Sequence, residues 1–355
     1  MTRRAMIAGG VASSVATLLG VRGFAQPSDA ARDAIARATP IDLHSHAGHL
    51  TGVSRVRKGG PFAPVAGPMR QGGLAIACLA IVADSPCHKV IGGRIRPFRD
   101  PDPGELYAYS ELGFGRLFDL VRQQRLSVVT DAASLRTATA DNPSVIVSSE
   151  GGDFLEGQAD RVDEAYHKYS MRHLQLTHYR VNELGDIQTE EPVHGGLTDA
   201  GADVIRRCNK LGVVVDVAHG TYDLVKRAAS VTTKPLVLSH TSLSNAAGPF
   251  TRTITDDHAR LIASTGGVIG VWPPDTIFRS LPAMARGMMR LADVVGVEHV
   301  GIGSDMEGLL SGSVFDDYSQ LPQLTQALLD AGFSGDDVTR ILGGNYVRVF
   351  EATLG

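Results

Sequence analysis

Short apolar runs of four to eight residues recur along most of the chain, and helical patterns separate them. Parallel strands that are buried on both faces have this appearance, and the helices between them supply the crossovers of repeated βα units. Eight strands close a (β/α)8 barrel of the TIM type, so the pattern predicts that α/β fold. Residues 128–130 form a further short candidate that could disturb the count. The eight expected strands lie near residues 41–44, 74–82, 144–148, 173–177, 213–217, 236–239, 268–271 and 300–303.

Amphipathic segments occupy the intervals between the expected strands. Residues 198–211 begin with a threonine that can cap a helix, and they place Val204, Ile205 and Leu211 on one side. Similar patterns occur at residues 223–229, 256–263, 282–295 and 321–331, and a helical tail follows at 335–354. Two segments rich in Gly, Pro and Arg, residues 47–72 and 84–103, predict long loops over the barrel mouth. A single barrel domain over residues 26–355 is therefore expected.

The first 25 residues have the pattern of an export signal. Arg3 and Arg4 precede an apolar run of about 14 residues at 8–21, and Gly23-Phe24-Ala25 has small residues where a signal peptidase cleaves. A membrane-spanning helix needs roughly 20 apolar residues, so the length favours cleavage near Ala25 over a retained anchor. We therefore expect a twin-arginine signal, the twin-arginine export machinery as a partner, and a periplasmic or secreted protein.

Charge and cysteine content argue against two other classes of protein. The 34 basic and 38 acidic residues balance at a formal charge of −4, without the basic stripe that a nucleic-acid partner requires. Cys78, Cys87 and Cys208 form no Cys-x-x-Cys pair, and their apolar surroundings predict at least two buried thiols instead of a disulfide framework.

Residues that can bind metal follow the expected strands at a nearly constant offset. In (β/α)8 barrels the carboxyl ends of the strands and the loops after them hold the active site. Each such residue alone is more often an ordinary loop or core residue, but several imidazoles converging with a carboxylate are most easily satisfied by a metal ion. Nitrogen and oxygen ligands without thiolate favour Zn²⁺, with Mn²⁺, Co²⁺ or Fe²⁺ as alternatives. The candidates are His44, His46, Glu150, His178, His219, His240 and Asp305.

The motifs around these residues resemble those of the membrane (renal) dipeptidase family of the amidohydrolase superfamily, from about residue 40 to the C-terminus. They are Ser149-Glu150-Gly151-Gly152, Leu176-Thr177-His178, Asp216-Val217-Ala218-His219, Ser239-His240-Thr241-Ser242, Gly303-Ser304-Asp305-Met306-Glu307-Gly308 and Gly343-Gly344-Asn345-Tyr346-Val347-Arg348-Val349-Phe350. The resemblance implies two zinc ions bridged by Glu150, one held by His44 and His46 and the other by His219 and His240. It also implies that His178 and Arg252 contact substrate and that Asp305 handles protons. Homodimers are frequent in the family, so a homodimer is among the expected partners.

One departure from the family lies in the first metal motif. The family has His-x-Asp at this place, whereas this chain has His44-Ser45-His46. Alternation along a strand still points both side chains to the same face. Replacing a carboxylate by a neutral imidazole removes one negative charge, which should make a bridging water more acidic and weaken the binding of the hardest metals.

The expected reaction is hydrolysis of the peptide bond of a dipeptide by a hydroxide that bridges two zinc ions. Asp305 would act as general acid and base, His178 would donate to the oxyanion, and Arg252 would bind the terminal carboxylate of the substrate. Without the resemblance, a surface salt bridge is the simpler role for Arg252. Trp272 either walls the pocket or packs in the core.

Two alternatives to a dipeptidase stay open at this point. A related exported amidohydrolase would act on N-acyl amino acids, lactams or another small amide or ester. A non-catalytic periplasmic binding protein on the same barrel is the second alternative, and it is disfavoured because every expected catalytic position is filled.

Overall fold

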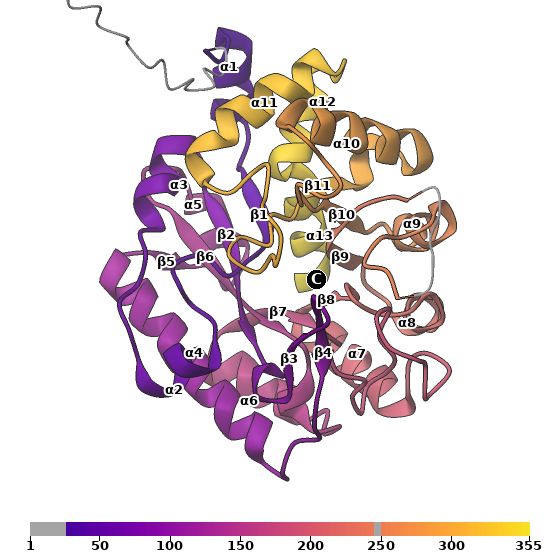
Figure 1. Cartoon of the computed structure of the whole chain (residues 1–355). Helices are drawn as coiled ribbons and strands as arrows, with labels where there is room; N and C mark the ends of the chain where they lie inside the picture. Colours follow the sequence, from indigo (N-terminus) through magenta and orange to yellow (C-terminus); the bar gives the residue numbers. More distant parts are fainter. Residues whose placement is uncertain (1–25, 245–249) are drawn as a thin grey trace, which may run out of the picture.

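The computed structural model describes residues 26–244 and 250–355, and within them eight parallel strands close into a barrel. Helices surround the barrel on its outside (Figure 1). The predicted (β/α)8 fold is confirmed, with all eight expected strands present. In order around the barrel they are β1 (Ile41–Ser45), β2 (Ile76–Val82), β6 (Ser144–Glu150), β7 (Met171–Gln175), β8 (Val214–Asp216), β9 (Leu236–Thr241), β10 (Val268–Val271) and β11 (Val300–Ile302).

The additional strand candidate is present as β5 (Ser127–Val128), but it does not enter the barrel. It pairs with the first two residues of β6, whereas β7 pairs with β6 from Val147 onward. The closure is made by β2 and β6, which pair in unbroken register from Ile76 opposite Ser144 to Val82 opposite Glu150. The count of eight is therefore undisturbed.

The five helices expected between the later strands are all confirmed. Thr198 caps α7 as predicted, because its side chain accepts the backbone N–H of Gly201. These helices are α7 (Asp199–Leu211), α8 (Tyr222–Val231), α9 (Asp256–Ser264), α10 (Leu281–Val295) and α11 (Leu321–Asp330). The others are α1 (Asp29–Arg37), α2 (Val53–Lys58), α3 (Ala66–Gly72), α4 (Glu105–Gln124), α5 (Ala132–Thr137), α6 (Arg161–Lys168), α12 (Gly335–Thr339) and α13 (Asn345–Leu354).

The two segments expected as loops carry regular structure of their own. Residues 47–72 contain α2 and α3, and residues 84–103 contain an antiparallel hairpin of β3 (His88–Ile91) and β4 (Arg94–Pro97). Arg94 donates to the backbone oxygens of Thr189 and Phe250 at 3.1 and 3.3 Å, and Arg96 forms a two-pronged ion pair with Glu190. The hairpin is thereby tied to the segments that follow β7 and β9.

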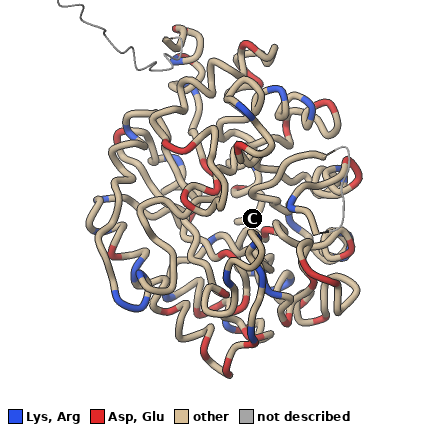
Figure 2. Tube along the Cα trace, in the orientation of Figure 1, with Lys and Arg blue, Asp and Glu red and all other residues tan. Residues whose placement is uncertain are grey.

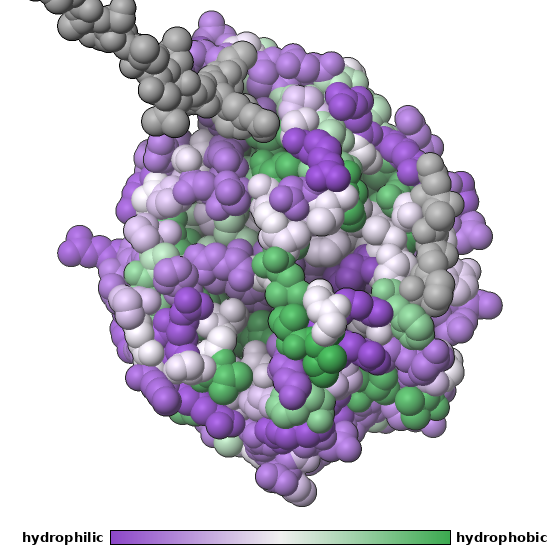
Figure 3. Space-filling model, viewed as in Figure 1, coloured by the Kyte–Doolittle hydropathy of each residue, from purple (hydrophilic) through white to green (hydrophobic). Residues whose placement is uncertain are grey.

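The described surface is mixed in character. Acidic and basic residues are both spread along the chain (Figure 2), and an apolar strip lies near the centre of the view in Figure 3, where Figure 1 places the hairpin. Val90 in this hairpin is 56% exposed.

All three cysteines are free and buried, as expected. No helix in the described ranges is long and apolar enough to span a membrane. The predicted export signal lies outside the described residues, so export stays a prediction.

A glycine on β10 generates a prediction about barrel stability. A Cβ atom on Gly270 would lie 1.8 Å from the backbone oxygen of Ser239 on β9, so Gly270→Ala requires the two strands to move apart. We expect a loss of about 3 kcal/mol in the free energy of unfolding, measured by urea denaturation. Gly115→Ala is the matched control, because nothing lies within 4 Å of its Cβ and it sits within helix α4. The control should gain up to about 1 kcal/mol, and equal effects of the two substitutions would contradict this account.

Candidate metal centre and active site

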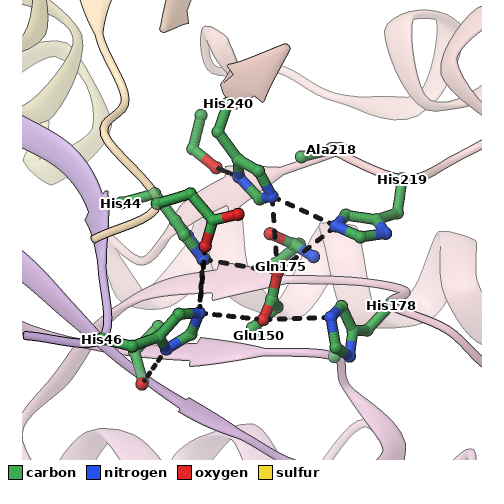
Figure 4. A network of polar contacts seen from close by, with 12 residues as sticks. His44, His46, Glu150, Gln175, His178, Ala218, His219 and His240 are labelled. Atoms are coloured by element: carbon green, nitrogen blue, oxygen red, sulfur yellow. Dashed lines mark hydrogen bonds and ion pairs between the residues drawn. The ribbon is translucent and has the colours of Figure 1, made fainter. Parts of the chain in front are cut away.

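Strand ends bring all seven predicted metal-site and proton-handling residues to one end of the barrel. All seven are buried, and the five histidines among them surround the carboxylate of Glu150 (Figure 4). His44 and His240 lie within strands, and Glu150 ends β6. The others follow their strands within three residues: His46 after β1, His178 after β7, His219 after β8 and Asp305 after β11.

The four imidazoles that are candidate ligands form two pairs. The Nε2 atoms of His44 and His46 are 3.2 Å apart, and those of His219 and His240 are 3.1 Å apart. Each of the four Nε2 atoms also lies 3.1 to 3.4 Å from a carboxylate oxygen of Glu150. Glu150 therefore contacts both histidine pairs: its Oε1 lies near His44, His219 and His240, and its Oε2 lies near His46.

This geometry fits a pair of metal ions. Two nitrogen ligands on a tetrahedral zinc ion, each 2.0–2.1 Å from the metal, are separated by about 3.3 Å. The Nδ1 of His46 donates to the backbone oxygen of Ala80 at 2.9 Å, which leaves its Nε2 lone pair directed at the cluster. The donor set of imidazole nitrogen and carboxylate oxygen suits zinc.

Burial and neighbouring charges shift the pKa values of the residues in the cluster. Burial alone would raise the pKa of Glu150, but His178 and His44 lower it well below its ordinary value. Burial lowers the pKa of His240 to about 4 and that of His219 well below its ordinary value. Burial has the same tendency at His46, but the hydrogen bond and charge of Glu150 raise its pKa to about 9. The ionised carboxylate of Glu150 and the neutral imidazoles of His219 and His240 are in the forms that bind metal, whereas His46 carries a proton that a metal ion would displace.

A small pocket lies directly beside the cluster. Its volume is about 160 Å³, and its walls include His46, Glu150, His178, Arg252, Trp272 and Asp305. Trp272 is thus a pocket residue, and its indole N–H donates to Asp305 Oδ2 at 3.2 Å. Asp305 Oδ1 lies 3.5 Å from His46 Nε2.

Arg252 is the cation of this pocket. It donates to the side-chain oxygen of Gln188 at 2.9 Å and to the backbone oxygen of His240 at 3.3 Å. No carboxylate of the described residues forms an ion pair with it, so the surface salt bridge that the sequence left open is not formed here. Its positive charge is available to a ligand in the pocket.

Two residues beside His178, Asp84 and His88, were not among those predicted from the sequence. Asp84 lies two residues after β2, and its Oδ1 accepts a hydrogen bond from His178 Nδ1 at 2.7 Å. His88 begins β3, lines the pocket, and has its ring centre 5.3 Å from that of His178. The offset rule that selected the other candidates also selects Asp84, once it is applied to the expected strand at 74–82.

Comparison with known proteins now places the chain. The sequence model of the membrane dipeptidase family, peptidase family M19, matches residues 116–354, which is more than half of the chain. The chain belongs to this family. The resemblance drawn from the short motifs is confirmed.

Individual curated relatives match this chain over only part of their length. The chain is similar to the dipeptidase aclJ of Aspergillus oryzae, with 34% identity over 58% of this chain and 50% of that protein. The chain spans about half the length of the curated relatives that it matches.

Solved structures share the fold. The probable dipeptidase PvdM of Pseudomonas aeruginosa has a TM-score of 0.74 at 19% identity, over 91% of this chain and 97% of that one. A metallo peptidase of Rhodobacter sphaeroides, solved with a phosphinate mimic of the dipeptide L-Ala-D-Ala, has a TM-score of 0.72 at 22% identity. That match covers 89% of this chain and 99% of the other.

The histidine pairs predict that zinc stabilises the folded protein. A ligand that binds only the folded state stabilises it by about 4 kcal/mol when its free concentration is a thousandfold above Kd, so Tm should rise by several degrees and fall again with a chelator. His219→Asn should lose most of this shift. His194→Asn, an exposed histidine outside the cluster, is the control and should keep it. An unchanged shift in His219→Asn would exclude His219 as a ligand.

Proposed function

We propose that this chain is a metal-dependent dipeptidase that hydrolyses the peptide bond of small dipeptides with two bound zinc ions. One observation carries the proposal: two histidine pairs contact one ionised carboxylate, and Arg252, which pairs with no carboxylate among residues 26–244 and 250–355, lines the same small pocket. The cluster suits hydrolysis of a carbonyl compound, and the arginine suits a substrate with a carboxylate.

The metal ions would be held by residues already described. His44 and His46 would bind one ion, His219 and His240 the other, and Glu150 both. Bound zinc supplies Lewis acidity to the scissile carbonyl and makes water a nucleophile at neutral pH. His46 replaces a family carboxylate, so the cluster contributes less negative charge and favours zinc over harder cations.

Asp305 is placed to move the proton of the reaction. The indole N–H of Trp272 holds its Oδ2, while Oδ1 faces the cluster near His46. A carboxylate held at one oxygen has the other free to take a proton from the attacking water and pass it to the leaving amine. We therefore assign Asp305 as general base and then general acid.

His178 and Arg252 are placed to hold the substrate. His178 Nε2 lies 3.2 Å from Glu150 Oε2, at the edge of the cluster where the carbonyl oxygen of a substrate would lie. Donation from this nitrogen would stabilise negative charge on that oxygen. The guanidinium of Arg252 would bind the terminal carboxylate in a bidentate manner.

The size of the pocket and the relatives support a dipeptide-sized substrate. A volume of about 160 Å³ is enough for a small substrate, and Ile95 of the hairpin lines the same pocket. The Rhodobacter sphaeroides structure, of the same fold, was solved with a mimic of L-Ala-D-Ala, and the relative from Aspergillus oryzae is named a dipeptidase.

Arg252 predicts a requirement for a free substrate carboxylate. Dipeptides should be hydrolysed about 10- to 100-fold faster, in kcat/KM, than their C-terminal amides, because a charge-assisted hydrogen bond contributes about 1.5–3 kcal/mol. Arg252→Ala should remove this preference. Arg260→Ala is the control, since Arg260 pairs with Asp257 on the surface. A preference that survives in Arg252→Ala would refute the carboxylate-binding role, and turnover of N-acyl amino acids but not dipeptides would favour the related amidohydrolase.

Glu150 predicts the number of metal ions. Elemental analysis of the purified protein should give about two metal ions per chain. Glu150→Gln should lower both the metal content and, by at least about 100-fold, the activity. Glu298→Gln, which changes a largely exposed carboxylate, is the control. One metal ion per chain in fully active enzyme would contradict the bridging role.

A further inference from the structure

Asp84 is a buried carboxylate at the edge of the active site that the proposed mechanism does not use. Its exposure is 0%, and it sits two residues beyond the end of β2. Val82 on that strand pairs with Glu150, and Ala83 donates its backbone N–H to the Glu150 backbone oxygen at 2.9 Å. The backbone oxygen of Asp84 also accepts the N–H of Cys87, which closes a tight turn. Asp84 is thus anchored to the strand that carries Glu150.

Both carboxylate oxygens of Asp84 face the segment that contains His178. Oδ1 accepts a hydrogen bond from His178 Nδ1 at 2.7 Å, and Oδ2 accepts the backbone N–H of Tyr179 at 3.0 Å. Burial alone would raise the pKa of Asp84, but the facing His178 and His88 hold it below its ordinary value, so it is ionised. A carboxylate in this form only accepts hydrogen bonds, so the proton of this contact belongs to His178 Nδ1.

We propose that Asp84 is a positioning residue that holds His178 by its Nδ1–H and so directs its Nε2 toward the substrate carbonyl. An imidazole with Nδ1 held in this way presents Nε2 on the opposite side of the ring, which is where Glu150 Oε2 lies at 3.2 Å. Both nitrogens of His178 thus face carboxylate oxygens, which only accept, so the form that donates from Nε2 is the imidazolium with a proton on each nitrogen. The pair resembles the arrangement in which a buried carboxylate orients a catalytic histidine in serine proteases. This inference rests on the proposed dipeptidase function for the identity of the substrate.

The position of His88 raises an alternative, in which this group of residues binds a metal ion. Its Nε2 lies 3.3 Å from the same Asp84 Oδ1, so Asp84, His88 and His178 together could hold a metal ion. The short contact between Asp84 and His178 favours a proton at that place, because the hydrogen bond already uses the oxygen that a metal ion would need. A metal ion bound by these three residues would contradict the positioning role of Asp84.

Asp84→Asn tests the proposal, because it keeps the size of the side chain and removes its charge. We expect kcat for dipeptides to fall about 10- to 100-fold, with KM within about twofold and the metal content unchanged. Combined with His178→Asn, it should cause no further loss, because both substitutions remove the same interaction. Fully additive losses would overturn the proposal.

Nuclear magnetic resonance of ¹⁵N-histidine-labelled protein provides a readout that needs no turnover. The wild type should show a protonated Nδ1 at His178, assigned by its loss in His178→Asn, and a strongly hydrogen-bonded proton on it. This signal should disappear or shift strongly in Asp84→Asn. It should persist in Asp153→Asn, a control that removes an equally buried carboxylate paired with Arg180.

The outcomes separate this inference from the proposed function. An unprotonated Nδ1 in the wild type, or a signal unchanged in Asp84→Asn, overturns the positioning role even if dipeptides are hydrolysed. A metal content that falls by one ion in both Asp84→Asn and His88→Asn overturns it in favour of a metal ion at these residues. If dipeptides are not hydrolysed at all, the proposed function fails, while the resonance of wild-type His178 still decides the role of Asp84.

Discussion

The ionised carboxylate of Glu150, buried among five imidazoles, is the interaction on which the rest of the site depends. Removing a carboxylate from water is strongly unfavourable unless positive charge or hydrogen-bond donors surround it. Here the Nε2 atoms of five histidines lie within 3.4 Å of its two oxygens, which lowers its pKa in spite of burial. A bound metal ion would supply positive charge to this cluster in place of the proton on His46.

The barrel makes this arrangement possible because parallel strands deliver their carboxyl ends to one place. The unbroken register of β2 and β6 sets the depth of Glu150 relative to Asp84, and small residues at Gly270 and Gly303 let backbones pass close to Ser239 just below His240. The hairpin of β3 and β4 then covers part of the mouth, held by Arg94 and Arg96. The barrel strands and the hairpin held over them together form walls of the small pocket beside the cluster.

Much of the fold and of the site could be predicted from the sequence, because the spacing of apolar residues and the position of polar residues after them follow from the physical requirements of a barrel. Buried parallel strands appear as apolar runs, and a histidine placed just after such a run must lie at the barrel mouth, as His178 and His219 do. Asp84 follows its expected strand at a similar offset, but an aspartate before Ser85 and Pro86 is also typical of a turn, so the local sequence does not distinguish the two roles. The hydrogen bond of Arg252 to Gln188 and that of Trp272 to Asp305 join segments that are distant in the sequence, and no local pattern encodes such contacts.

Crystallographic anomalous scattering at the zinc absorption edge, from protein loaded with zinc, tests the central claim most directly. The account predicts two anomalous peaks in each chain, one beside His44 and His46 and one beside His219 and His240, with the carboxylate of Glu150 between them. A single peak, or a peak bound by Asp84, His88 and His178 in place of one of these, would contradict it.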